Sequence, residues 1–149
     1  MTVSTTTTTV TYAGNDVTTV FSFSFIGVAA SDISVTYTDS AGTSVILSPS
    51  LYTLILNPVA PGTLWGIGGS VTYPIVGSPP VPIPTGSFLS ITRTLPLTQT
   101  ISIGNQGAFY PQAVEQALDK LEFQIQQLNT DYLYTMKFPI TDINPPNTL

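Results

Sequence analysis

Residues 21–25 read Phe-Ser-Phe-Ser-Phe, which places three aromatic rings on one side of an extended chain and two hydroxyl groups on the other. Strict alternation of apolar and polar side chains is typical of a β-strand with one buried face. The same alternation recurs in Ile33-Ser34-Val35-Thr36-Tyr37. These two segments predict that the chain builds its core from strands.

Turn-forming residues separate further strand candidates. The stretch Asp39-Ser40-Ala41-Gly42 predicts a turn that returns the chain through Val45, Ile46 and Leu47. Other candidate strands are residues 52–56, 70–75 and 88–93, with loops at 57–69 and 76–86. The second loop holds too many prolines for a central strand and is expected to be an extended surface loop or arm. This spacing predicts a mainly β fold, a small antiparallel β-sandwich or barrel-like domain.

The pattern becomes helical after Pro111, a residue that suits the first helical position because its missing N–H would be unpaired there. Apolar residues then recur at intervals of four and three, and we call this set the seam: Val114, Leu118, Leu121, Ile125, Leu128 and Tyr132. The seam spans about two and a half heptads. It fits an amphipathic helix packed on its own β-domain and, equally, a short parallel bundle of identical chains. Phe123 lies off the seam and suggests a second contact for this helix.

Charged residues make up only 7% of the chain, against a typical share of about 25%. None occurs between residues 40 and 92. The surface is therefore expected to be occupied by neighbouring subunits or, alternatively, to be covered by Thr and Ser hydroxyl groups.

The net charge of −5 and only three scattered cations disfavour nucleic acid and anionic membranes as partners. No stretch reaches the roughly 18 apolar residues of a membrane helix, so no membrane insertion is expected. The Thr-rich start lacks the basic and apolar regions of a signal peptide.

Histidine and cysteine are absent, which excludes Ser-His-Asp and Cys-His nucleophile pairs and most transition-metal sites. Glu115, Asp119 and Glu122 share one helix face, but beside Lys120 they are typical of a solvated surface rather than of a glycosidase acid pair. Arg93 is the only cation in the first 119 residues and is expected to meet a carboxylate or backbone carbonyls; an exposed strand end is the alternative. The sequence predicts no enzyme and no cofactor.

Three segments together resemble a known family. They read TYAGNDVTTVFSFSF at residues 11–25, LSITRTLPLTQ at 89–99 and ISIGNQGAFYPQAVEQALDKLEFQIQQL at 101–128. Their order resembles the N-terminal attachment domain of tail fibres and tailspikes from short-tailed phages. The likeness extends from about residue 11 to residue 139 and is weakest in the middle, where a Pro-rich stretch at 76–86 replaces an expected shorter link. Ile103-Gly104 also stands where relatives tend to have charged residues.

The resemblance implies a homotrimer that docks on a phage tail tube or tail adaptor protein and passes through its helix into the fibre. It places the trimer contact on the seam residues Leu118, Leu121, Ile125 and Leu128, and either a docking or a subunit contact near residues 105–109. The predicted interface residues are thus Arg93, Asn105, Gln106, Phe109, Leu118, Leu121, Ile125 and Leu128. Because the chain stops soon after the helix, the fibre or spike body is expected to be a separate polypeptide.

The expected organisation follows the chain in order. It comprises a flexible arm at 1–10, a β-rich domain at 11–94, a connector at 95–110, a trimerising helix at 111–138 and an extended tail at 139–149. The predicted function is that of a virion structural protein, an adaptor that anchors a receptor-binding appendage to the phage tail and is assembled in the host cytoplasm. The alternative is a carbohydrate-binding or adhesin module for host-surface attachment, with aromatic side chains stacking on sugars.

Overall fold

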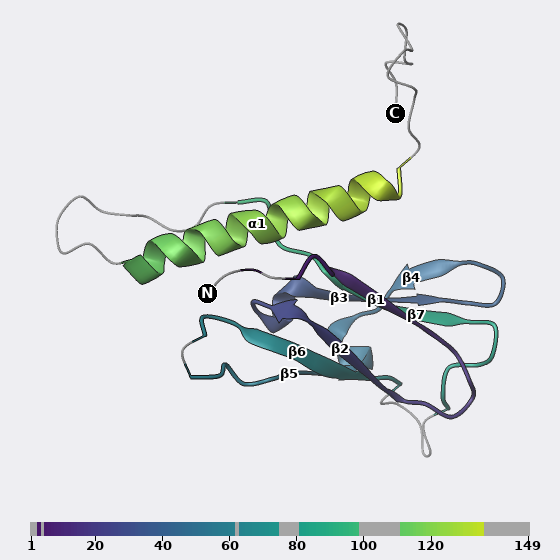
Figure 1. Ribbon diagram of the computed structural model, residues 1–149. Coiled ribbons are helices and arrows are strands. Elements are labelled where there is room, and N and C mark those ends of the chain that lie inside the picture. Colours follow the sequence, from purple (N-terminus) through teal and green to yellow (C-terminus); the bar gives the residue numbers. More distant parts are fainter. Residues whose placement is uncertain (1–2, 4, 62, 75–80, 99–110, 136–149) are drawn as a thin grey trace, which may run out of the picture.

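A computed structural model describes residues 3, 5–61, 63–74, 81–98 and 111–135 (Figure 1). These residues form seven strands, two short 3-10 helices and one α-helix: β1 (Thr9–Ala13), β2 (Val20–Gly27), η1 (Ala30–Asp32), β3 (Ile33–Thr38), β4 (Ser44–Ile46), η2 (Pro49–Leu51), β5 (Thr53–Leu56), β6 (Gly66–Thr72), β7 (Phe88–Arg93) and α1 (Pro111–Leu133). One sheet has the order β1-β7-β3-β4 and the other β2-β6-β5, and every pairing is antiparallel. The two sheets form a small β-sandwich, and the prediction of a mainly β fold followed by a helix is confirmed.

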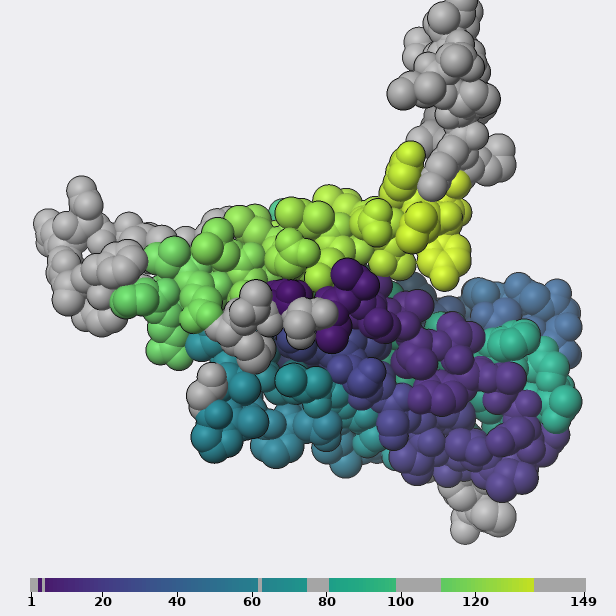
Figure 2. Space-filling model, viewed as in Figure 1, coloured from purple at the N-terminus to yellow at the C-terminus, as the bar shows by residue number. Residues whose placement is uncertain are grey.

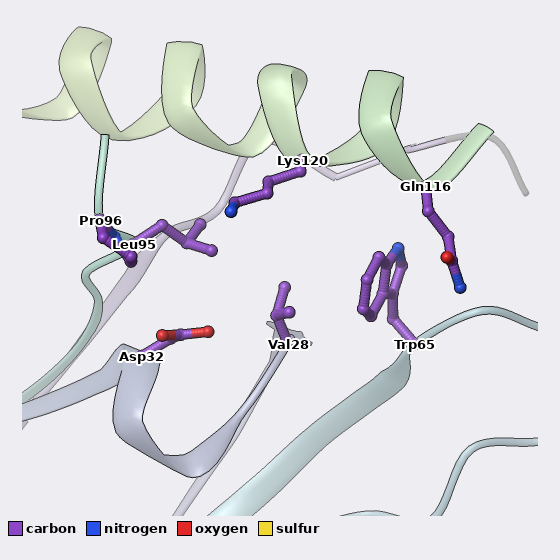
Figure 3. A pocket seen from close by; sticks show the side chains of 7 residues that line it. All are labelled: Val28, Asp32, Trp65, Leu95, Pro96, Gln116 and Lys120. Carbon is purple, nitrogen blue, oxygen red and sulfur yellow. The ribbon is translucent and has the colours of Figure 1, made fainter. Parts of the chain in front are cut away.

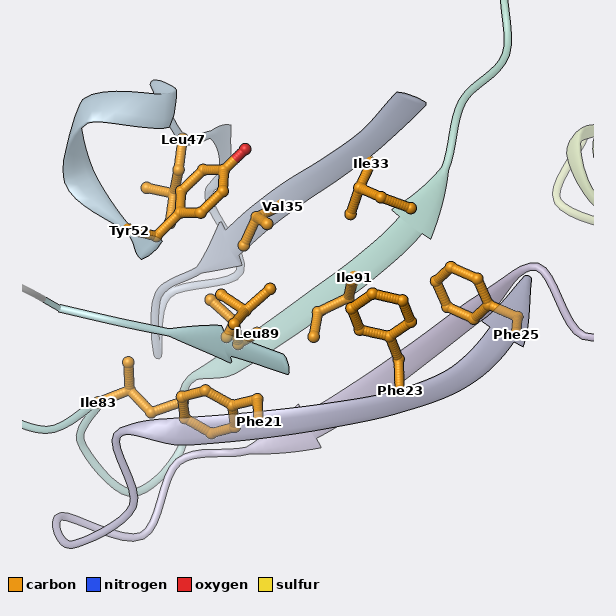
Figure 4. Close-up of a cluster of buried hydrophobic side chains, with 11 residues drawn as sticks. Phe21, Phe23, Phe25, Ile33, Val35, Leu47, Tyr52, Ile83, Leu89 and Ile91 are labelled. Atoms are coloured by element: carbon orange, nitrogen blue, oxygen red, sulfur yellow. The ribbon is translucent and has the colours of Figure 1, made fainter. Parts of the chain in front are cut away.

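The alternation in β2 fills the core between the sheets. Phe21, Phe23 and Phe25 are 1%, 6% and 1% exposed, while the intervening serines face outward. The rings point toward Leu89 and Ile91 of β7 (Figure 4). Burying an aromatic or aliphatic side chain of this size stabilises the fold by roughly 1.5–3 kcal/mol. Because the three rings face inward, they do not form the sugar-stacking platform that the carbohydrate-binding alternative needs.

The predicted loop at 57–69 is too long, because β6 already begins at Gly66. Its glycines allow close backbone approach: a Cβ at Gly69 would lie 2.4 Å from the Ile55 carbonyl oxygen and 2.7 Å from the Phe23 ring. Gly68 also has a φ of +75°, which favours glycine. Glycines that look like loop residues in the sequence are therefore the ones that let this strand pack against its neighbours.

Two further boundaries differ from the predictions. The expected flexible arm at 1–10 is wrong for its second half, because β1 begins at Thr9 and the Thr8 carbonyl accepts a hydrogen bond from the Arg93 N–H at 2.8 Å. In the Pro-rich loop, Ile83 is only 3% exposed and belongs to the sandwich core. The described part of that loop is thus anchored and is not a free arm.

The helix α1 lies across one end of the sandwich (Figure 1). At that end β2 and β7 finish, and β3 and β6 begin. The helix starts at Pro111 as predicted and ends at Leu133, five residues before the predicted limit of 138. The predicted tail at 139–149 and most of the connector at 95–110 lie outside the described residues. No helix in the described part of the chain has the length and apolar character that crossing a membrane requires.

Candidate assembly surface

Two faces of α1 have different surroundings. Asp119, Phe123 and Gln126 are buried against the sandwich. The seam residues after Val114 are all exposed: Leu118 61%, Leu121 49%, Ile125 59%, Leu128 51% and Tyr132 59%. At 3.6 residues per turn, the centres of the two faces lie about 150° apart. One helix can therefore pack on its own domain and still present the seam to another molecule.

The buried face rests on a small hydrophobic cluster separate from the sandwich core. Phe123 is fully buried and packs with Ile26 at the end of β2 and with Leu95. Its ring meets the edge of Trp65 with centroids 6.5 Å apart and planes inclined by 68°. The expectation that Phe123 makes a second contact, off the seam, is confirmed. We call the contact of α1 with Ile26, Trp65, Arg93 and Leu95 the helix–sandwich interface.

Arg93 lies at the centre of the helix–sandwich interface and is 1% exposed. Its guanidinium group stacks 4.3 Å from the centroid of Phe123, which is a cation–π contact. Nη1 donates to the Ile26 carbonyl at 3.2 Å, and Nη2 donates to the side-chain oxygen of Gln126 at 2.8 Å. Burial lowers the pKa of Arg93 to about 10, so the group remains protonated at neutral pH. The ring and the two acceptors thus compensate part of the cost of a buried charge, while Nε has no hydrogen-bond partner among the described residues.

The structure bears on two sequence predictions for Arg93. It meets one backbone carbonyl, as expected, but its side-chain partner is the neutral amide of Gln126 rather than a carboxylate. It is also not a surface residue: the chain itself buries the guanidinium group, so Arg93 cannot lie directly on a subunit or docking interface. The reason is that α1 folds back over the end of β7, which the sequence alone does not indicate.

Three glutamines hold the helix through backbone groups. Gln127 accepts from the Leu95 N–H at 2.7 Å and donates to the Leu95 carbonyl at 3.4 Å. Gln124 donates to the Pro96 carbonyl at 2.8 Å, and Gln126 donates to the Thr5 carbonyl at 3.0 Å. In the sequence, Gln126 is not distinguished from the solvated surface expected around Glu115, Asp119 and Glu122. The sequence feature that could have indicated this contact is the run Gln124-Ile125-Gln126-Gln127. Its glutamines are polar but uncharged, and they lie on the side of the helix that packs inward.

Two acidic residues of α1, Asp119 and Glu122, accept hydrogen bonds from neighbouring side chains. Asp119 accepts from the Trp65 indole N–H at 3.3 Å, and Glu122 accepts from Gln126 at 3.3 Å. Together with Glu115, both line a shallow groove of about 680 Å³ along the seam. Within the described ranges there is no cluster of three or more acidic side chains that could hold a metal ion.

A second hollow of about 280 Å³ lies under the N-terminal half of α1 (Figure 3). Trp65, Val28 and Leu95 form apolar walls, and Asp32 and Lys120 approach from opposite sides. Its two charged residues have opposite signs, whereas glycosidic-bond hydrolysis uses two carboxyl groups flanking the bond. The hollow therefore lacks that arrangement.

The remaining predicted interface residues divide into two groups. Leu118, Leu121, Ile125 and Leu128 lie side by side on the exposed face of α1, where a partner could contact them. Asn105, Gln106 and Phe109 lie outside the described residues. The exposed seam is thus the candidate assembly surface.

Replacing Gln126 with alanine is expected to loosen the helix–sandwich interface. The change removes an acceptor of the buried Arg93 guanidinium group, and a hydrogen bond to a charged group is worth about 1.5–3 kcal/mol. The free energy of unfolding should fall by about 2 kcal/mol in a urea titration. Gln112→Ala, at an exposed position of the same helix, is the matched control and should change stability little. Equal stabilities of the two variants would contradict the role given to Gln126.

Comparison with known proteins adds the following. No protein-family profile matches the chain. In sequence it is similar to the tail spike protein of Salmonella phage epsilon15, with 37% identity over 119 residues. The match covers 80% of this chain and 10% of the tail spike protein, so the chain spans about a tenth of the length of that relative. By sequence, the chain is therefore a homologue of one segment of a phage tail appendage protein.

Proposed function

We propose that the chain is a structural component of a phage tail appendage, in which α1 joins three copies and the β-sandwich anchors the appendage to the tail. The observation that carries the proposal is the exposed seam. Five large side chains of α1 stay 49% to 61% exposed while the opposite face of the same helix is buried. Contiguous exposed apolar side chains are characteristic of an interaction surface.

Three joined copies bind a tail more strongly than one copy. Linking the sandwiches through α1 makes each later docking event intramolecular, which raises the effective concentration of the remaining domains. The helix–sandwich interface supports this role because it fixes each sandwich to its own helix through Arg93, Phe123 and Gln126. In this arrangement, assembly of the helices determines the positions of the sandwiches.

The sandwich surface suits docking on protein. The outer face of the four-stranded sheet carries rows of hydroxyl side chains, since Thr9 and Ser34 flank Thr92, and Thr11 and Thr36 flank Ser90. These rows contain no charged residue, so their contacts should depend little on salt. The proposed partners are a tail tube or tail adaptor protein at the sandwich and a fibre or spike polypeptide beyond the helix. We propose no catalytic role.

An epitope tag tests the tail location. Particles assembled with a tagged copy of the chain are expected to bind gold-labelled antibody at the tail in negative-stain electron microscopy. Label on the capsid, or a chain that does not enter particles, would contradict the proposal. A glycan array with the purified chain tests the carbohydrate-binding alternative, for which specific binding to one glycan is the diagnostic result.

A further inference from the structure

The N-terminal segment, residues 3 and 5–8, lies between α1 and the sandwich. Figure 2 shows its purple atoms against the green helix. Val3 packs on the cluster of Ile26, Leu95 and Phe123. The Thr5 carbonyl accepts from Gln126, and the Thr8 hydroxyl lies 2.7 Å from that of Thr130. The segment therefore follows the helix and is held at several points along it.

The same segment borders the seam. Val3 lines the groove of about 680 Å³ together with residues of α1: Glu115, Leu118, Asp119, Leu121, Glu122 and Ile125. Three of these residues belong to the seam, so the floor of the groove is continuous with the exposed apolar face. One wall of the groove is thus supplied by a segment that precedes the β-domain in the sequence.

We propose that this groove receives α1 of a second copy of the chain, so that Val3 belongs to the subunit interface together with the seam. The inference rests on the proposed function, because it takes the seam to be the surface that joins the copies. The inference adds Val3 to the subunit contacts, a residue that the heptad spacing of α1 does not include. It also assigns a role to the low-complexity start of the chain.

The charged residues beside the seam favour one occupant of the groove, α1 of a second copy in parallel orientation. Glu115 and Glu122 each follow a seam residue, whereas Ala117 and Gln124 each precede one. Along the groove, from Glu115 to Ile125, one flank of the seam is therefore acidic and the other neutral, and Asp131, which precedes Tyr132, lies beyond the groove. In a parallel bundle the acidic flank of one helix faces the neutral flank of its neighbour. In an antiparallel pair the two acidic flanks face each other. A parallel second copy therefore brings neutral side chains to the acidic flank. An antiparallel copy or an anionic partner would bring like charges together.

Val3→Asp tests the inference, with Val17→Asp as the matched control. Val17 is 76% exposed in the turn between β1 and β2, and it does not line the groove. Aspartate at position 3 would add a carboxylate to a groove already lined by Glu115, Asp119 and Glu122, and assembly would bury that charge. The dissociation constant of the assembly, from light scattering over a dilution series, should rise at least tenfold for Val3→Asp and stay within twofold for Val17→Asp.

Cross-linking gives a second measurement that does not depend on a destabilising change. The chain contains no cysteine, so a single introduced thiol can form a disulfide only with another copy. A co-folded mixture of Val3→Cys and Ala117→Cys chains is expected to give a covalent heterodimer on oxidation, whereas Val17→Cys with Ala117→Cys should give none.

The outcomes separate the inference from the proposed function. A wild-type chain that stays monomeric at all concentrations would refute the proposed trimer and the inference with it. A trimeric wild type whose assembly is unaffected by Val3→Asp, or whose Val3→Cys chains do not cross-link to Ala117→Cys chains, would refute the inference alone. Weakened assembly together with the cross-link would support both.

Discussion

A chain with Leu121→Asp and Ile125→Asp is expected to be a monomer with an intact β-sandwich. In one chain these side chains are 49% and 59% exposed, so carboxylates there remain hydrated and cost little. In a bundle the same positions would bring two carboxylates from each chain into an apolar seam, where unpaired charge is strongly unfavourable. Light scattering should give a mass near 15.8 kDa, with the β signal in far-ultraviolet circular dichroism unchanged.

The matched control places the same charge change off the seam. Gln112 is exposed on α1 and Val17 is exposed in the turn between β1 and β2, and Gln112→Asp with Val17→Asp should leave the assembled mass unchanged. If the seam variant also kept the mass of the wild-type assembly, contacts between the sandwiches would be holding the copies together. The role of α1 as the joining element would then be wrong.

Replacing Phe123 with alanine is expected to cause a large loss of stability. The ring is fully buried, packs with Ile26 and Leu95, and covers the Arg93 guanidinium group. Deleting a buried aromatic ring costs about 3–5 kcal/mol, since the transfer energy is lost and a cavity remains. For a chain of this length, the melting temperature should fall by on the order of 10 °C.

The fluorescence of Trp65 reports directly on the Phe123→Ala substitution. Trp65 is the only tryptophan in the chain, and its ring meets Phe123 edge to face. Phe123→Ala should expose the indole to water and shift its fluorescence to longer wavelength. The control is Phe88→Ala, because Phe88 is 44% exposed on β7 and its removal should cost much less. Unchanged fluorescence in Phe123→Ala would mean that α1 does not rest on the sandwich in solution.

The strands with alternating side chains could be predicted from the sequence, and those without could not. The Phe-Ser alternation of β2 predicted its buried face, and β7 lies where predicted, at Phe88–Arg93. The start of β6 could not be predicted, because Gly66, Gly68 and Gly69 carry no side-chain pattern and are needed only for close approach of other segments. The Thr run before residue 10 conceals only the start of β1 at Thr9, since identical side chains show no alternation.

Periodicity identified the seam but could not say how the helix uses its other faces. A packed helix and a bundled helix were equally compatible with the spacing, and in the structure one face packs on the sandwich while the seam stays exposed. The helix–sandwich interface depends on Arg93, Gln126 and Gln127 meeting groups far away in the sequence. Such contacts arise from the three-dimensional path of the chain, which local patterns do not encode.

The central claim is that the seam joins three copies of the chain. Size-exclusion chromatography with light scattering on the purified wild-type chain tests it most directly. We predict a mass near three times 15.8 kDa that persists on dilution into the micromolar range. A mass near 15.8 kDa at every concentration tested would contradict it, because the exposed seam would then have no partner in further copies of the chain.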